Sequence, residues 1–160
     1  MLFRSARENL KGSWAGATGQ CQFMPSNING FARDFDGDGR KDIWTSHGDI
    51  FASIAYLLKK QGWQKGKEVG TLAINTKGKK VKANRYYSAQ KYHQWGFVQD
   101  NGDKIKGIWK RRVEAIPFQN SPVILRGSNY APLMKWNKSS LFAALNILIY
   151  RELKALKNYQ

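Results

Sequence analysis

The stretch that decides the fold is GSWAGATGQCQFMPS, residues 12–26, followed closely by the acidic run DFDGDGRKD, residues 34–42. Three glycines within eight residues of the first stretch allow the backbone to adopt positive φ or to approach a ligand closely. Ser13 and Gln22 supply hydrogen-bond donors and acceptors, and they stand beside a tryptophan and a phenylalanine with flat apolar faces. Polar groups next to flat faces suit the binding of a sugar.

The acidic run resembles the first half of an EF-hand calcium loop. Asp34, Asp36 and Asp38 stand at positions one, three and five, and a glycine follows where the sharp turn is needed. Arg40 would offer its backbone carbonyl at position seven. The second half differs, because position twelve is Thr45 rather than a bidentate glutamate, so an ordinary EF-hand is not expected.

Calcium is nevertheless the predicted occupant of this loop, in a structural role. Gathering three or more carboxylates without a cation would cost several kcal/mol of mutual repulsion at moderate effective dielectric. The alternative is an acidic loop in which Asp-Gly pairs simply form turns.

Two segments have the apolar periodicity of helices, residues 49–61 and 139–157. Asp49 or Ser46 would cap the first, Gly62 would end it, and a serine stands at the head of the second. Residues 23–31 predict a short third helix. The glycine-rich section between them reads as mostly loop, with short strands at 69–75 and 122–125.

The charge balance indicates an anionic partner. The 160 residues carry 27 Lys and Arg against 11 Asp and Glu, a net charge of +16. Basic residues concentrate in 59–82 and 104–112, with aromatic residues interleaved, as in proteins that bind single-stranded nucleic acid. No recognised nucleic-acid motif accompanies them, so a solvated basic face or an anionic envelope polymer is favoured. The single Cys21 excludes an internal disulfide, and His47 and His93 are isolated.

The residues quoted above also carry a family resemblance. Together with Trp44-Thr45-Ser46, Asp49, Ala52-Ser53 and Gly62-Trp63, the first stretch resembles the lytic murein transglycosylases of the membrane-bound B type, glycoside hydrolase family 103. A weaker resemblance resumes at Trp136-Asn137-Lys138-Ser139 and Phe142-Ala143. A motif of this length is far more specific than a lone glycine pattern.

The resemblance implies a mainly α, lysozyme-like fold with an EF-hand-like loop and a loop-rich middle section. It implies a single partial domain over 1–160, with the signature segment at 12–63, the basic section at 64–133, and a terminal groove element and helix at 134–160. The expected protein is monomeric, acts on peptidoglycan glycan strands, and is periplasmic or anchored to the outer membrane. Cleavage of the bond between N-acetylmuramic acid and N-acetylglucosamine would leave a 1,6-anhydromuramyl end.

The family's functional residues transfer only where the motif matches. Ser13, Gln22 and Phe23 match positions that face the glycan, as do Trp136, Asn137 and Phe142, with Trp136 and Phe142 standing where the family usually has tyrosines. Family members close the calcium loop with an aspartate at the next helix start, which Asp49 matches, and Asp42 would ligate the ion or support a bound water. The other readings of Ser13 and Gln22 are a helix cap and a turn brace. For Phe23 the other reading is the core, where aromatic side chains beside a helix more often lie.

The family's catalytic glutamate has no counterpart here, because no Glu-Ser pair exists in the sequence. Of the eleven acidic residues, five belong to the acidic loop and its closing Asp49, and five others stand in charged, solvated surroundings. Glu8 is left as a candidate, but Arg7 and Lys11 nearby would lower its pKa, which is the wrong direction for a general acid. We therefore expect part of an enzyme, with residues 1–5 non-native, since Leu-Phe-Arg-Ser is what the end of a common sequencing adapter encodes. A non-catalytic module that binds wall polymers is the alternative, and a nucleic-acid binder is a third.

Overall fold

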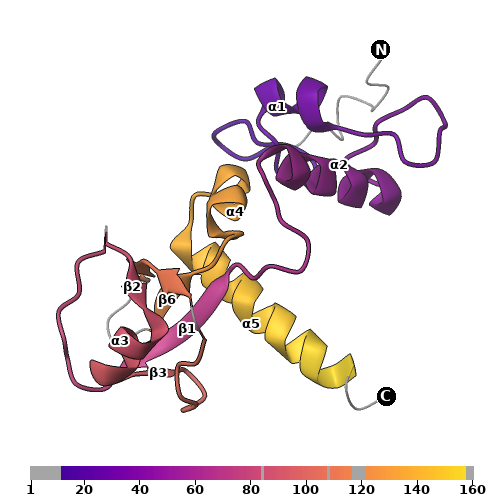
Figure 1. Cartoon of the computed structure of the whole chain (residues 1–160). Helices are drawn as coiled ribbons and strands as arrows, with labels where there is room; N and C mark the ends of the chain where they lie inside the picture. Colours follow the sequence, from indigo (N-terminus) through magenta and orange to yellow (C-terminus); the bar gives the residue numbers. More distant parts are fainter. Residues whose placement is uncertain (1–11, 84, 108, 117–121, 158–160) are drawn as a thin grey trace. The chain divides into compact units, whose positions relative to one another are not determined.

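The computed structural model describes residues 12–83, 85–107, 109–116 and 122–157. The chain divides into two compact units, Met1–Gln61 and Gly62–Gln160, called here the N-terminal and C-terminal units (Figure 1). The expectations for Glu8 and for residues 1–5 concern positions outside the described residues.

The described part of the N-terminal unit contains two helices, α1 (Pro25–Phe31) and α2 (His47–Lys60), joined by the acidic loop (Figure 1). Pro25 opens α1, where a missing N–H costs nothing and a fixed φ suits the helix. The Ser46 hydroxyl caps α2 by accepting a hydrogen bond from the Asp49 N–H at 3.3 Å. The apolar face of α2 is buried through Ile50 and Leu57. Both helices predicted for this unit, at residues 23–31 and 49–61, are therefore present within a few residues at their ends.

The C-terminal unit combines short strands with three helices. Its elements are β1 (Gly70–Asn75), β2 (Tyr87–Ser88), α3 (Ala89–Gln94), β3 (Phe97–Gln99), β4 (Lys110–Arg111), β5 (Val113–Glu114), β6 (Val123–Arg126), α4 (Tyr130–Trp136) and α5 (Ser140–Lys157). Four strands form an antiparallel sheet in the order β3-β1-β6-β5, and β2 pairs with β4.

The sheet separates two apolar clusters because side chains alternate between faces along a strand. Leu72 of β1 and Ile124 of β6, which are register partners, belong to the cluster that contains residues of α4 and α5. Their neighbours Ala73 and Leu125 belong to the other cluster, which contains Tyr92 of α3. Side chains on both faces of β1 and β6 are thus buried in apolar clusters.

The expectation of a mainly α fold is wrong. The four-stranded antiparallel sheet makes the C-terminal unit a mixed α and β structure. Among the described residues, the section predicted to be loop-rich, residues 64–133, holds six strands, α3 and the start of α4. Four of these strands have only two or three residues, too few for an alternating pattern to be visible in the sequence.

Candidate functional site

Residues 12–23 fold into a compact double turn stabilised mainly by their own backbone. Thr18 forms bridges with both Gly12 and Phe23, so the chain doubles back on itself twice. Ser13 holds the first turn: its N–H donates to the Ala17 carbonyl at 2.7 Å, and its hydroxyl accepts from the Ala17 N–H at 3.2 Å. Ser13 is exposed, and its own O–H proton remains available to an external acceptor.

Gln22 occupies the second turn in a strained conformation. Its φ of +49° lies in the left-handed region, which residues other than glycine rarely adopt. Its backbone N–H and its side-chain Nε2 both donate to the Gly19 carbonyl, at 3.1 and 2.9 Å. The side chain is exposed and one of its two amide N–H groups is used internally, so the amide oxygen and the other N–H are offered outward. A strained polar residue on the surface is typical of a functional position.

Gly19 shows why this segment needs glycine. Its φ is +68°, and a Cβ there would lie 2.7 Å from both Cγ1 and the carbonyl oxygen of Ile43. The adjoining Gln20 donates from its backbone N–H to that Ile43 carbonyl at 2.8 Å and from its side chain to the Trp44 carbonyl, also at 2.8 Å. The double turn is therefore tied to the end of the acidic loop. Sequence reasoning assigned no role to Gln20, and no sequence signal identified this contact.

Two residues of the segment point into the core instead of outward. Phe23 has 1% of its surface exposed, so the structure places this predicted sugar contact in the interior of the unit. Cys21 is also buried, and its thiol donates to the Ile50 carbonyl in the first turns of α2 at 3.6 Å. Burial raises the pKa of Cys21 to about 11, so the thiol stays protonated and unreactive at neutral pH.

The acidic loop brings three carboxylates together. Oxygens of Asp34, Asp36 and Asp49 lie within 4.8 Å of one another. Asp34 shapes the turn by accepting from the Gly37 N–H at 2.7 Å and the Gly39 N–H at 2.9 Å. Among the described residues these three carboxylates form no ion pair. Each oxygen retains a lone pair, so the cluster could hold a hard cation.

Asp49 ties the two ends of the loop to the start of α2. It has 1% of its surface exposed, and it accepts from the Phe35 N–H at 2.8 Å and from the Asp42 N–H at 2.7 Å. Its place in the first turn of α2 also suits a negative charge near a helix N-terminus. One buried side chain thus fixes a loop whose ends are seven residues apart.

The remaining predicted ligands lie outside this three-carboxylate cluster. Asp38 accepts from the Arg40 N–H at 2.8 Å, and both residues are exposed. Asp42 instead holds the next turn, accepting from the Trp44 N–H at 2.8 Å and from the backbone and hydroxyl of Thr45. Desolvation acts to raise the pKa of Asp42, but these hydrogen bonds and the nearby Arg40 outweigh it and hold the pKa below its ordinary value.

The other three predicted glycan contacts lie at the junction of α4 and α5 in the C-terminal unit. The rings of Trp136 and Phe142 meet edge to face, with centroids 5.4 Å apart and planes at 83°. The exposed Asn137 accepts from the Ser139 N–H at 3.1 Å, and Ser139 caps α5 by accepting from the Phe142 N–H at 3.2 Å. The three residues therefore form one local group, separate in the chain from Ser13, Gln22 and Phe23.

The acidic residues of the C-terminal unit hold the fold together. Four of them are engaged by guanidinium groups, in the pairs Arg111–Glu68, Arg126–Glu114, Arg151–Asp100 and Arg151–Glu152. The fifth, Asp103, forms a turn with Asn101. All five acidic residues of the C-terminal unit thus have an ion-pair or hydrogen-bond partner within that unit.

Comparisons with known proteins identify the family of the chain. The family described as "Transglycosylase SLT domain" matches residues 4–148, and the chain belongs to this family. Among curated proteins, the membrane-bound lytic murein transglycosylase B of Escherichia coli K12 is 48% identical over 65 residues, which is 41% of this chain and 18% of that protein. The family resemblance seen in the sequence is confirmed.

Solved structures of lytic transglycosylases share the fold. SltB3 from Pseudomonas aeruginosa, in complex with NAG-anhNAM-pentapeptide, is 32% identical with a TM-score of 0.69, covering 85% of this chain and 38% of that one. The Escherichia coli enzyme Slt35, in complex with calcium, is 28% identical with a TM-score of 0.67, covering 95% of this chain and 48% of that one. The chain thus spans less than half the length of these relatives.

No helix in the described part of the chain is both long enough and apolar enough to cross a bilayer.

Proposed function

We propose that this chain provides glycan-binding and calcium-binding elements of a peptidoglycan lytic transglycosylase that works in the cell envelope. The observation that carries the proposal is the strained, outward-facing Gln22 inside the family's signature segment. The amide oxygen of Gln22 and the hydroxyl of Ser13 would hydrogen-bond the acetamido and hydroxyl groups of the glycan. Trp136, Asn137 and Phe142 would contribute a second set of contacts from the α4–α5 junction.

The family membership supports peptidoglycan as the polymer. The relatives are lytic transglycosylases, and one of them is solved with a bound fragment that contains both sugar and pentapeptide. The reaction needs a single carboxyl group that first protonates the glycosidic oxygen and then accepts the proton of the attacking C6 hydroxyl. We assign no residue of this chain to that step, and its residues would bind and position the glycan.

Calcium is the proposed cation of the acidic loop. The fit rests on the three converging carboxylates, which offer the oxygen ligands that calcium prefers. We propose Asp34, Asp36 and Asp49 as the side-chain ligands, with Asp38 and the Arg40 carbonyl completing the site. Asp42 would support the loop through its turn with Thr45. When bound, the ion would neutralise the cluster and hold the loop against α2.

Replacing Gln22 tests the glycan assignment. Gln22→Ala removes the amide and should weaken binding of chitooligosaccharides by about tenfold, the loss expected for one or two hydrogen bonds. Gln22→Gly should weaken binding equally while raising stability by about 1 kcal/mol, because glycine adopts positive φ without strain. Isothermal titration calorimetry and thermal melting separate the two effects. Unchanged affinity in both variants would refute the placement of Gln22.

Replacing single aspartates tests the calcium assignment. Asp36→Asn should weaken calcium binding by about tenfold or more, because it removes one charged ligand. Asp103→Asn, an exposed aspartate of the C-terminal unit, is the matched control and should leave binding unchanged. Calorimetric titration with calcium measures both. Equal affinities in the two variants would rule out the loop as the calcium site.

A further inference from the structure

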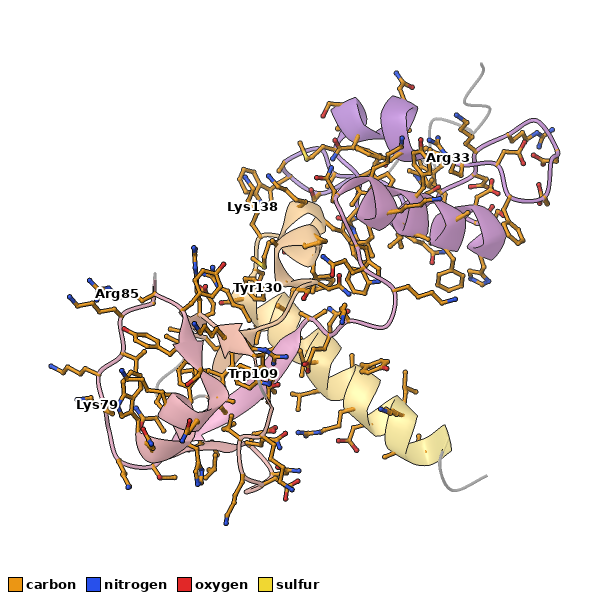
Figure 2. All side chains as sticks on the ribbon, in the orientation of Figure 1. Arg33, Lys79, Arg85, Trp109, Tyr130 and Lys138 are labelled. Atoms are coloured by element: carbon orange, nitrogen blue, oxygen red, sulfur yellow. The ribbon has the colours of Figure 1, made fainter. Side chains whose placement is uncertain are left out.

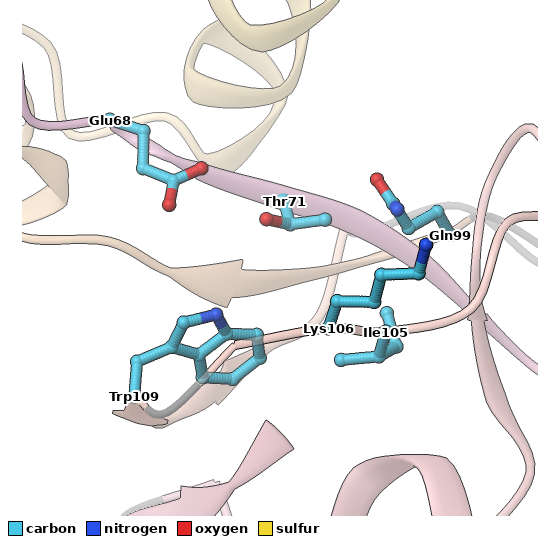
Figure 3. A pocket seen from close by; sticks show the side chains of 6 residues that line it. All are labelled: Glu68, Thr71, Gln99, Ile105, Lys106 and Trp109. Carbon is cyan, nitrogen blue, oxygen red and sulfur yellow. The ribbon is translucent and has the colours of Figure 1, made fainter. Parts of the chain in front are cut away.

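A second candidate binding site lies in the C-terminal unit, in residues that the proposed glycan contacts do not include. It is a pocket of about 160 Å³ lined by Glu68, Thr71, Gln99, Ile105, Lys106 and Trp109. Figure 3 shows the carboxylate of Glu68 and the ammonium of Lys106 toward opposite ends of this pocket. A volume of this size suits one small group of a larger ligand.

Arg111 organises one side of the pocket. Its guanidinium pairs with the carboxylate of Glu68, donates to the Thr71 hydroxyl at 2.8 Å, and lies 4.2 Å from the centroid of the Trp109 ring. Arg111 itself is buried, with 7% of its surface exposed. The pair neutralises Glu68, and the guanidinium covers one face of the indole. The lining is therefore held in place before any ligand arrives.

The charge that remains in the lining is that of Lys106. This side chain is exposed, and it forms none of the ion pairs found among the described residues. Two neutral donors stand with it, the Thr71 hydroxyl, which accepts from Arg111 and can donate its own proton, and the Trp109 indole N–H. One cation and two N–H or O–H donors around a small volume favour a carboxylate group.

The remaining groups favour a peptide over a sugar. A sugar ring stacks on a free aromatic face, and the face of Trp109 that Arg111 covers is closed to such stacking. Gln99 donates its side-chain nitrogen to the Lys104 carbonyl at 3.3 Å, which leaves its amide oxygen to accept from a peptide N–H. Ile105 adds an apolar contact for a small side chain.

The surrounding surface would attract such a ligand. The C-terminal unit contains 19 Lys and Arg against 5 Asp and Glu, a net +14, whereas the N-terminal unit contains 8 against 6, a net +2. Basic side chains such as Lys79 and Arg85 extend outward from this unit in Figure 2. An anionic peptide would therefore be drawn to the unit that holds the pocket.

We infer that this pocket binds a short peptide through its carboxylate group, with Lys106 as the charged contact and Thr71 and Trp109 as the hydrogen-bond donors. The inference rests on the proposed function, since the stem peptide of peptidoglycan would be the natural source of such a ligand. It assigns to the C-terminal unit a role in recognising the peptide part of the polymer, distinct from binding of the glycan.

The test follows the indole N–H signal of Trp109 by nuclear magnetic resonance in the ¹⁵N-labelled chain. The probes are N-acetyl-D-alanyl-D-alanine, the same dipeptide with a C-terminal amide, and chitotriose. The acid should shift the Trp109 signal saturably, and the amide should bind about fivefold more weakly because it lacks the charge. Lys106→Gln should weaken binding of the acid by a similar factor, while Lys110→Gln, which removes an exposed lysine outside the lining, should not.

Several outcomes would overturn the inference. Equal responses to the acid and the amide would show that the pocket does not recognise the carboxylate. The absence of a saturable shift would show that the pocket does not bind the dipeptide. Saturation by chitotriose and not by the dipeptide would make the pocket a sugar site. Because the dipeptide contains no sugar, its binding to the pocket is independent of the glycan binding measured with the Gln22 variants. Peptide binding without any glycan binding would refute the proposed function while retaining the pocket.

Discussion

The two units of this chain are stabilised in different ways. In the N-terminal unit, short helices flank turns whose shape is set by glycine backbones and by aspartate side chains that accept from backbone N–H groups. In the C-terminal unit, a two-faced sheet buries apolar clusters, and arginines pair with the acidic side chains. The comparison teaches that local chemistry specifies the first unit, whereas long-range pairing specifies the second.

The largest expected effect is the loss of Asp49. Asp49→Ala leaves the N–H groups of Phe35 and Asp42, whose hydrogen bonds are partly buried, without their acceptor, and each such loss costs up to about 1–3 kcal/mol where water cannot replace the acceptor. We expect amide exchange in α2 to accelerate strongly while exchange in β1 and β6 stays unchanged. An equal acceleration of amide exchange in α2 and in the strands β1 and β6 would show that Asp49 does not stabilise the N-terminal unit specifically.

Gly19→Ala should destabilise the same unit by about 2–4 kcal/mol, since it adds a steric clash to the strain of positive φ. The clash is with Ile43, including its carbonyl oxygen at 2.7 Å. Gly16→Ala is the matched control, because Gly16 also has positive φ but no atom lies within 4 Å of its added Cβ. It should cost about 1 kcal/mol. Chemical denaturation measures the free energy of unfolding of both variants. Equal losses in the two variants would show that the contact with Ile43 does not contribute.

Alkaline pH should weaken the two units in different ranges. Burial raises the pKa of Cys21 to about 11 and that of Tyr92 to about 12. When burial raises the pKa of a group in the folded state, the unfolded chain ionises at a lower pH than the folded one. The stability that depends on the protonated group is therefore fully present below the unfolded pKa and is lost as the pH rises from the unfolded to the folded pKa. The N-terminal unit should begin to lose stability above about pH 8.5, where an unfolded thiol ionises, and the C-terminal unit only above about pH 10.

Amide exchange measured across this pH range checks the difference. Cys21→Ala should abolish the earlier loss, and Tyr92→Phe should reduce the later one, to which Tyr130 also contributes because burial raises its pKa as well. Simultaneous loss in both units, or an early loss that persists in Cys21→Ala, would contradict the assignment.

The same contrast explains what the sequence could predict. Helix α2 follows from apolar spacing and the Ser46 cap, and the loop from its aspartates and glycines, because these signals act over a few residues. Strands β1 and β6 were visible as apolar runs, but their pairing joins Leu72 to Ile124, more than fifty residues apart. Helix α4 was not predicted, because its seven residues are too few to show a helical apolar period.

The candidate site divides in a similar manner. The importance of Asp34, Asp36 and Asp49 as a group was predictable from motif and family, and the structure brings their oxygens together. The burial of Phe23 agrees with the core reading, which is the commoner one for an aromatic residue beside a helix, rather than with the predicted sugar contact. The pocket around Lys106 and Trp109 had no sequence signal, because its lining comes from segments brought together only by the sheet.

The central claim is that calcium holds the N-terminal unit in the shape that presents Gln22. The most direct test is the rate at which Cys21, buried against the Ile50 carbonyl, reacts with iodoacetamide at pH 8 in calcium and in chelator. At a calcium concentration ten times the dissociation constant, the account predicts a rate about tenfold slower than in chelator. Exchange in β1 and β6 should not change. Equal Cys21 rates with and without calcium would contradict the claim.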